Sequence, residues 1–172
     1  PYVDIADIIE RATASGEDLF VLVLDLIQNP QNLGTLLRTA EAAGVHGVII
    51  PQHRAAAVTP AVVTASAGAS EHMLIVQGNI TRSLEQLKQA GAWVIGLAGE
   101  EGAASPAVIP LTGPLAIVVG NEGEGLRELV RHSCDFLLSL PMRGRIESLN
   151  AAVAGSIVLY QAMLARLKEQ KS

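Results

Sequence analysis

The sequence predicts a single α/β domain, spanning residues 1–172, built on a mostly parallel sheet with helices on both faces. The chain has 172 residues, which is enough for one compact core. Short apolar runs alternate with helical stretches, and right-handed crossovers join such units into a parallel sheet. The run 19–27 (LFVLVLDLI) is almost unbroken. This pattern is typical of a strand that is buried on both faces.

The predicted elements follow one another along the chain with recognisable boundaries. A short amphipathic helix over 3–14 ends at Gly16. Asn29 and Pro30 are suited to cap and begin the next helix, and Gly44 ends it. Further helices are predicted over 59–68, 81–90, 125–132 and 147–169. Strands are predicted over 19–27, 45–50, 73–76, 92–97, 115–119 and 136–140, with a loop over 98–114.

The long C-terminal helix has two different apolar faces. One is a stripe of larger side chains, and the other carries small residues that allow close packing. The sequence leaves open whether the small face packs within one subunit or against a second one. The stripe comprises Leu149, Val153, Ile157, Tyr160, Leu164 and Leu167, and the small face comprises Ala151, Ala154, Gly155, Val158, Ala162 and Ala165.

Composition narrows the class of protein. The single cysteine, Cys134, excludes an intrachain disulfide, gives no metal-ligand cluster and is expected to be a small core residue. No apolar run approaches the roughly 20 residues that span a bilayer, and no signal peptide is visible. We therefore expect a cytoplasmic protein with no metal and no membrane partner. The net charge of −5 and the 3% aromatic content do not indicate an autonomous nucleic-acid binder.

Polar residues gather where predicted strands end. Ligands of open parallel sheets bind beyond the carboxyl ends of the strands, which directs attention to 28–38, 97–102, 120–125 and 140–150. In the first segment, Asn32 and Arg38 are six positions apart and do not share a helical face. They converge only if Asn32 lies in an irregular entry turn. The alternative is a capped helix with a solvated arginine.

The other two segments are also ambiguous when taken alone. In GNEGEGLRELV, residues 120–130, the glycines let the backbone approach a ligand closely. The spacing G-x-x-G-x-G differs from the dinucleotide-binding G-x-G-x-x-G, and Glu122 inside the turn is hard to explain as a cap. Ser148 and Asn150 are expected in the first turn of the last helix. Their groups suit a carboxylate or a sugar, but simple capping explains them equally well.

Together, three stretches resemble the motifs of the SpoU family within the SPOUT superfamily of methyltransferases. They are NPQNLGTLLRTAEAAG, IVVGNEGEGL and LPMRGRIESLNAAVAGSIVLYQ, in the family's order and over nearly the whole chain. VHGVIIP and GNEGEGL are similar to the branch that methylates guanosine in 23S ribosomal RNA. The resemblance implies a C-terminal deep trefoil knot, S-adenosylmethionine bound within it in a bent conformation, and a homodimer.

The resemblance further implies an RNA ribose 2′-O-methyltransferase, with rRNA favoured over tRNA as substrate. It assigns catalytic roles to Arg38, Asn32, Glu122, Ser148 and Asn150, and donor binding to Leu97, Ala98, Gly120, Leu140, Met142 and Leu149. A guanidinium is too basic to accept a proton near neutral pH, so an electrostatic role for Arg38 is favoured over that of a base. Glu122 is expected to pair with Arg38 and fix it.

Two departures from the family pattern leave the substrate open. Residues 143–147 (RGRIE) are more charged than expected, and Arg143 and Arg145 are candidates for contact with RNA phosphate. Many relatives have an N-terminal RNA-binding domain, which we expect to be missing here. The alternatives are a tRNA 2′-O-methyltransferase and a noncatalytic RNA-binding or ribosome-assembly module. A nucleotide-binding oxidoreductase is disfavoured by the glycine spacing.

Overall fold

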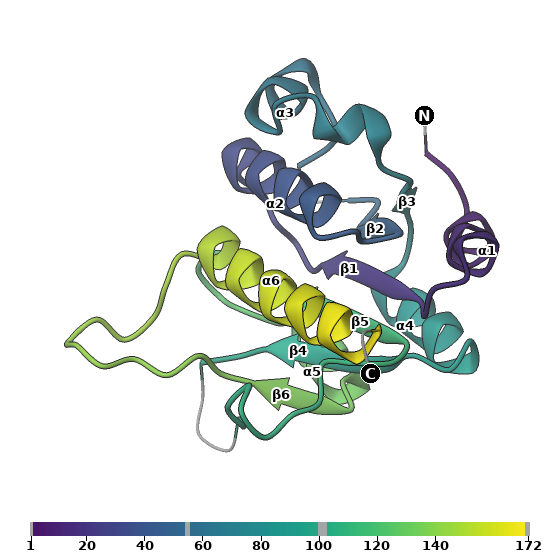
Figure 1. Ribbon diagram of the computed structural model, residues 1–172. Coiled ribbons are helices and arrows are strands. Elements are labelled where there is room, and N and C mark those ends of the chain that lie inside the picture. The colour runs from purple at the N-terminus through teal and green to yellow at the C-terminus, as the bar shows by residue number, and fades with distance from the viewer. Residues whose placement is uncertain (1, 54–55, 100–102, 171–172) are drawn as a thin grey trace.

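The strands of the computed structural model form one parallel sheet (Figure 1). The structure describes residues 2–53, 56–99 and 103–170. Its six strands lie in the order β3-β2-β1-β5-β4-β6, and every pairing is parallel. The strands are β1 (Phe20–Leu24), β2 (Gly47–Ile50), β3 (Ile75–Gln77), β4 (Trp93–Leu97), β5 (Leu115–Val119) and β6 (Phe136–Leu138). The predicted parallel α/β sheet is confirmed.

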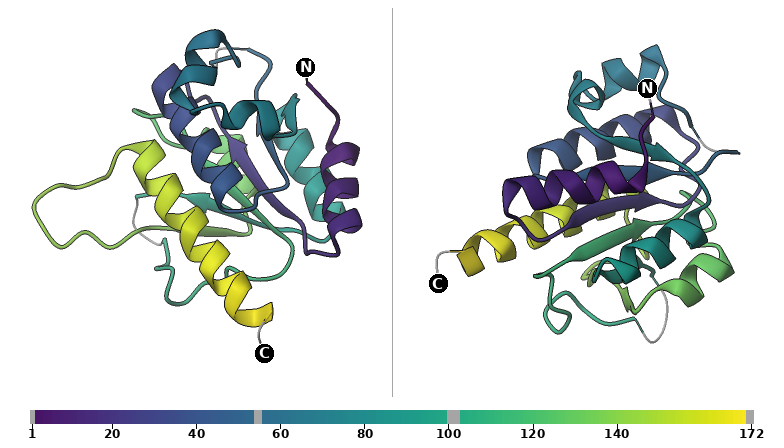
Figure 2. Two further views of the ribbon diagram at one scale, coloured as in Figure 1. Left: turned by 45° about the horizontal axis from the view of Figure 1, so that its top comes forward. Right: turned by 90° about the vertical axis from the view of Figure 1, so that its right-hand side faces the viewer.

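Helices cover both faces of this sheet, as predicted (Figures 1 and 2). One apolar layer packs α2, α3 and α6 on one face, and a second packs α1, α4 and α5 on the other. The helices are α1 (Ile5–Ser15), α2 (Pro30–Ala42), α3 (Pro60–Ala65), α4 (Ile80–Gln89), α5 (Glu128–Ser133) and α6 (Ala151–Gln170), with a short 3₁₀ helix η1 (Ala69–His72). No helix in the described part of the chain combines the length and apolar character that a membrane crossing requires.

Strand β1 is the centre of the sheet and explains its topology. All five of its residues are buried, because helices cover both of its faces. It pairs with β2 on one side and with β5 on the other. Along the chain, β2 and β3 are added outward from β1. The chain then crosses to the opposite side of β1, where β5 lies between β1 and β4, and β6 lies beyond β4. The boundary between β1 and β5 is therefore a topological switch point, where open α/β sheets bind ligands.

The predicted start of α2 is confirmed in detail. Asn29 is the N-cap, and its side-chain oxygen accepts hydrogen bonds from the backbone N–H groups of Gln31 and Asn32 at 2.8 and 3.2 Å. Pro30 is the first helical residue, where its missing N–H costs nothing. Helix α1 likewise ends at Gly16, which adopts the left-handed conformation with φ of 69°.

The predicted start of α6 at Glu147 is wrong. The helix begins at Ala151, and residues 141–150 form an extended loop that stands away from the body of the protein (Figures 1 and 2). Asn150 sets this boundary, because its Oδ1 accepts hydrogen bonds from the N–H groups of Ala152 and Val153 at 2.9 and 3.2 Å. Ser148 therefore lies before the helix rather than in its first turn, and Asn150 caps it.

The two faces of α6 are used differently. The small face packs inward, where a Cβ added to Gly155 would lie 2.8 Å from Leu36 of α2 and 3.0 Å from Val119 of β5. Small residues thus serve packing within the subunit, which resolves the alternative that the sequence left open. The larger side chains face outward. Val153, Ile157, Tyr160, Leu164 and Leu167 are 37–59% exposed, whereas Leu149, the first residue of the predicted stripe, precedes the helix.

Candidate active site

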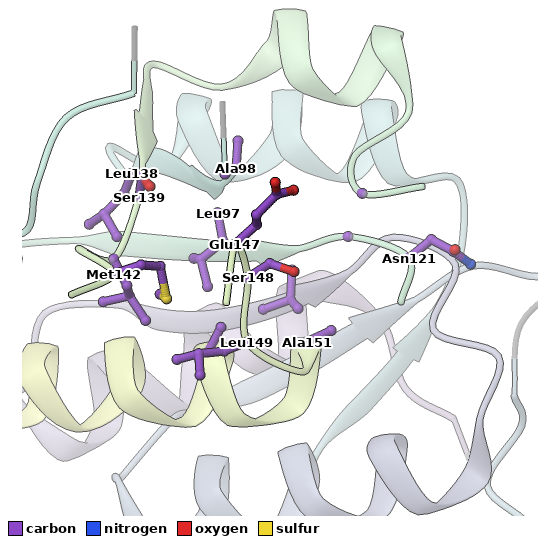
Figure 3. Close-up of a pocket in the computed structure, with 16 residues that line it drawn as sticks. Leu97, Ala98, Asn121, Leu138, Ser139, Met142, Glu147, Ser148, Leu149 and Ala151 are labelled. Carbon is purple, nitrogen blue, oxygen red and sulfur yellow. The ribbon is translucent and has the colours of Figure 1, made fainter. Parts of the chain in front are cut away.

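A pocket opens beyond the carboxyl ends of β4, β5 and β6 (Figure 3). The space between its walls is about 620 Å³ when the open mouth and adjoining solvent are included. Figure 3 shows Leu138 and Met142 toward one end of the lining and Asn121 toward the other. The lining comes from the end of β4, the turn after β5, and the segment that runs from β6 into α6.

All six residues predicted to bind the methyl donor line this pocket. They are Leu97, Ala98, Gly120, Leu140, Met142 and Leu149. Most of them contribute apolar side chains, which suit the faces of a flat ring, while the nearby backbone can bind its edge. Residues 100–102 of the predicted segment 97–102 lie outside the described residues. In the described ranges, no group of three or more His, Cys, Asp or Glu side chains is arranged to hold a metal ion.

Gly120 has a steric role in the wall of the pocket. A Cβ at this position would lie 2.4 Å from the carbonyl carbon of Gly125 and 2.5 Å from the nitrogen of Leu126. The turn closes through paired backbone hydrogen bonds between Asn121 and Gly125, at 2.9 and 3.0 Å. Gly125 has a φ of 74°, which favours glycine. The G-x-x-G-x-G spacing therefore lets the turn fold back directly onto the end of β5.

A polar network connects the three motif segments beside the pocket. The carboxylate of Glu122 accepts hydrogen bonds from the backbone N–H groups of Gln28 and Asn29, the shortest at 2.8 Å, and from Asn32 Nδ2 at 3.3 Å. Asn150 Nδ2 donates to Asn32 Oδ1 at 3.3 Å. Three of the five predicted catalytic residues thus meet, although they come from distant parts of the chain.

Glu122 is held in its ionised form. Burial acts to raise the pKa of its carboxyl group, but hydrogen bonds from the N–H groups of Asn29, Glu122 itself and Gln28, and from the Asn32 side chain, lower the pKa below its ordinary value. The carboxylate also lies at the N-terminus of α2, where the helix dipole stabilises negative charge. A carboxylate of lowered pKa is a weak proton acceptor near neutral pH.

The other two predicted catalytic residues are placed differently. Ser148 lines the pocket (Figure 3). Arg38 lies on the exposed side of α2, outside the pocket lining. Within the described ranges it forms no ion pair with Glu122, so the expected pairing is absent because backbone amides occupy the Glu122 carboxylate. Asn32 and Arg38 are both helical, roughly 9 Å apart along the axis, and do not converge.

Comparison with known proteins decides the family. The model of the SpoU rRNA Methylase family matches residues 19–160, a span that contains every predicted site residue. The chain belongs to the SpoU family. This membership confirms the resemblance that the three motifs indicated.

Relatives in the SpoU family cover most of this chain. This chain is 41% identical over 163 residues to the putative TrmH family tRNA/rRNA methyltransferase YacO of Bacillus subtilis. The match covers 93% of this chain and 64% of that protein. The chain is 46% identical over 149 residues to the 23S rRNA (guanosine-2′-O-)-methyltransferase RlmB of Pseudomonas putida, covering 85% and 59%. The chain therefore spans about three-fifths of the length of these curated relatives.

A solved SpoU structure matches the whole fold. The crystal structure of the SpoU methyltransferase AviRb from Streptomyces viridochromogenes, in complex with the cofactor AdoMet, superposes with a TM-score of 0.84 at 31% identity. The match covers 98% of this chain and 66% of that one.

Sequence reasoning overlooked Asn121, which organises the turn of this SpoU chain. Its Nδ2 donates to the carbonyl oxygen of Leu26 at 2.8 Å, and its Oδ1 accepts from the N–H groups of Gly123 and Glu124 at 2.9 and 3.1 Å. Asparagine side chains often hydrogen-bond the backbone two residues further on, so the turn role of this residue was identifiable. Its long-range contact with Leu26 was not.

Proposed function

We propose that this chain carries the methyl-transfer site of an RNA ribose 2′-O-methyltransferase that acts on guanosine in 23S rRNA. The observation that supports this most directly is the convergence of the three motifs. They form one pocket at the strand ends, beside the hydrogen-bonded residues Asn32, Glu122 and Asn150. The name of the Pseudomonas putida relative favours 23S rRNA over tRNA.

The residues of the pocket fit S-adenosylmethionine. The apolar lining from Leu97, Leu140, Met142 and Leu149 suits an adenosine group, and Ala98 and Gly120 line the pocket beside them. These six residues would hold the donor. When bound, S-adenosylmethionine would supply a sulfonium methyl group that a ribose 2′-oxygen can attack, with S-adenosylhomocysteine as the leaving group and loss of the hydroxyl proton.

The protein's own residues would orient the acceptor. Ser148 stands in the pocket lining and offers a hydroxyl group to the ribose or the donor. Asn32 and Asn150 are fixed by their mutual hydrogen bond, and Glu122 holds Asn32 in turn. Because the Glu122 carboxylate already accepts several hydrogen bonds, it orients its neighbours rather than removing the proton. Orientation of this kind is a major source of rate enhancement.

Arg38 would act through its charge. Its exposed guanidinium is available to bind an RNA phosphate or to stabilise the negative charge that develops on the 2′-oxygen. It is too basic to serve as a general base. Arg143 and Arg145, exposed on the loop 141–150, are proposed to contact phosphates of the same RNA.

We also propose a homodimer formed through α6. The outward stripe on this helix presents five large apolar side chains that are 37–59% exposed, namely Val153, Ile157, Tyr160, Leu164 and Leu167. A continuous apolar stripe of this kind marks an interaction surface. The family resemblance favours a second copy of the chain as the partner. The same resemblance is the basis for the proposed trefoil knot, and the packing of α6 against α2 and β5 after a long loop is compatible with it.

Calorimetry with S-adenosylmethionine, followed by methyl transfer to 23S rRNA and to tRNA, tests the proposal. We expect donor binding and transfer to a guanosine 2′-hydroxyl of 23S rRNA. Transfer to tRNA alone would replace the proposed substrate with tRNA. Donor binding without transfer to either RNA would favour a noncatalytic RNA-binding or ribosome-assembly module. A folded protein that does not bind the donor would overturn the enzymatic proposal. The expected cytoplasmic location stays a prediction.

A further inference from the structure

A fully buried carboxylate lies at the end of the central strand. Asp25 follows β1 directly, and its side chain is 0% exposed. Its Oδ1 accepts a hydrogen bond from Arg127 Nε at 2.7 Å, and its Oδ2 accepts one from the backbone N–H of Arg127 at 2.9 Å. A single residue that is distant in sequence therefore satisfies both oxygens of the carboxylate. The outer part of Arg127 reaches solvent, because its side chain is 49% exposed.

The ion pair fastens one wall of the pocket. We call residues 120–126 the pocket turn, because Gly120, Asn121 and Gly125 line the pocket. Asn121 attaches the start of this turn to the carbonyl oxygen of Leu26 at 2.8 Å. Arg127 attaches its other end to Asp25. The pocket turn is thus held at both ends against the segment that leads into α2.

The segment that leads from β1 into α2 is itself held in an unusual conformation. Leu26 has a φ of 64°, a left-handed conformation that is unfavourable for a residue with a side chain of this kind unless its surroundings enforce it. The ion pair holds Asp25, the residue before Leu26, and the hydrogen bond from Asn121 holds the carbonyl oxygen of Leu26 itself. The same segment continues to Asn29, the cap of α2. The contacts therefore connect the pocket turn, which lines the proposed methyl-donor pocket, to the start of α2, which carries Asn32.

Stability alone does not account for such a pair. Removing the carboxylate of Asp25 from water is costly, and buried ion pairs are often no more stabilising than apolar residues of similar size. What the pair supplies is a fixed geometry. Resting on the proposed function, we propose that Asp25 and Arg127 are positioning residues that hold the pocket turn in the shape that binds the methyl donor. Neither residue lines the pocket, so they act through Gly120 and Gly125.

The chain offers a matched control at the opposite end of the sheet. The Oδ2 of Asp135 accepts a hydrogen bond from the backbone N–H of Val94 at 2.8 Å, and its Oδ1 lies 3.8 Å from Lys88 Nζ. This carboxylate is also paired with a cation and a backbone amide, but it stands near the start of β4 and outside the pocket lining. The variants Arg127→Gln and Lys88→Gln therefore remove comparable cations from two carboxylates.

The experiment measures donor affinity by calorimetry, steady-state kinetics, and amide hydrogen exchange in the pocket turn of the protein without donor. We expect Arg127→Gln to weaken donor binding by about tenfold, to raise the donor KM while kcat stays nearly unchanged, and to accelerate exchange within 121–126. Lys88→Gln is expected to leave donor affinity within about twofold of the unaltered protein, since its contacts lie elsewhere.

Arg127→Lys is the second variant, and it carries the test if Arg127→Gln does not fold. It keeps the positive charge but loses the fork whose Nε and Nη2 atoms both contact Asp25 Oδ1, so we expect an intermediate loss of affinity. Donor affinity equal to that of the unaltered protein in the folded Arg127 variants would overturn this inference and leave the proposed function intact. Absence of donor binding by the unaltered protein would overturn the proposed function and, with it, this role for the pair.

Discussion

Asn150 donates a hydrogen bond to Asn32 at 3.3 Å, which joins the cap of α6 to the first turn of α2. The same asparagine accepts hydrogen bonds from the N–H groups of Ala152 and Val153. One side chain thus performs two separable tasks. Its oxygen begins α6, and its nitrogen connects that helix to the polar network of the proposed active site.

Substitution of Asn150 separates these tasks. Asn150→Asp keeps the capping oxygen but loses the Nδ2 donor, so stability should stay within about 0.5 kcal/mol of the unaltered protein. Asn150→Ala loses both groups, and the free energy of unfolding should fall by about 1 kcal/mol. We expect methyl transfer to fall sharply in both variants. Urea denaturation and a transfer assay measure the two effects, and full transfer by the aspartate variant would show that the link to Asn32 is dispensable.

Arg38→Ala should abolish most transfer without weakening donor binding. Arg38 lies outside the donor pocket, so its removal leaves the lining intact. Loss of a group that stabilises developing charge costs about 10²–10³-fold in kcat. Arg11→Ala, at another exposed arginine on α1, is the matched control and should leave transfer unchanged. Calorimetry and single-turnover kinetics report the two steps, and a large loss of donor affinity in Arg38→Ala would contradict the acceptor-side role.

Two glutamates make the fold sensitive to acid. The hydrogen bond with His46 is the main cause that lowers the pKa of Glu17 below its ordinary value of 4.5. His46 Nδ1 accepts from the N–H of Phe20 at 3.0 Å, so its proton stands on Nε2, which faces Glu17 at 3.2 Å. The pKa of Glu122 is also lowered, by the hydrogen bonds that outweigh its burial.

A lowered folded-state pKa adds stability above the unfolded-state pKa, and this stability is lost as the pH falls through the folded value. The free energy of unfolding should therefore be nearly constant around neutral pH and fall below the ordinary glutamate pKa of 4.5. Glu122→Gln and Glu17→Gln should each flatten that fall, as measured by urea denaturation at several pH values. Glu85→Gln, at an exposed site on α4, serves as the comparison. An acid dependence identical in all three variants would refute this assignment.

Cys134 should be unreactive in the folded protein. Burial is the main cause that raises the pKa of its thiol to about 12, and Sγ lies 3.3 Å from the carbonyl oxygen of Val130. The thiolate is the reactive form, so iodoacetamide at pH 8 should modify Cys134 only after the chain unfolds. Mass spectrometry with and without urea measures this difference. Rapid modification under native conditions would mean that the region around α5 opens readily.

The fold and the pocket were predictable because their signals are local. The apolar run that becomes β1, the cap of α2 at Asn29 and the glycines of the pocket turn each act on their immediate neighbours. Polar residues after strand ends then indicated one edge of the sheet. The six proposed donor-binding residues were named from the family resemblance, and they line a single pocket at this edge.

The remaining features depend on contacts between distant residues. The amides of Gln28 and Asn29 bind Glu122, and no local pattern indicates that they displace Arg38 as its partner. The start of α6 was ambiguous because Asn150 suits both a helix and its cap. The orientation of α6 could not be derived from its sequence, since both of its faces are apolar. The closeness of Leu36 and Val119 to Gly155 determines which face is buried.

The exposed stripe on α6 provides a test of the proposed dimer. Leu164 is 59% exposed, so a glutamate there can be solvated in a free subunit without disturbing the core. In a dimer formed through this stripe the same charge would be buried without a partner, which is costly. We therefore expect sedimentation velocity to show a dimer for the unaltered protein and a folded monomer for Leu164→Glu. Leu129→Glu, at a leucine of α5 that is 74% exposed, should stay dimeric. A monomeric unaltered protein, or a dimer that persists in Leu164→Glu, would contradict the proposed interface.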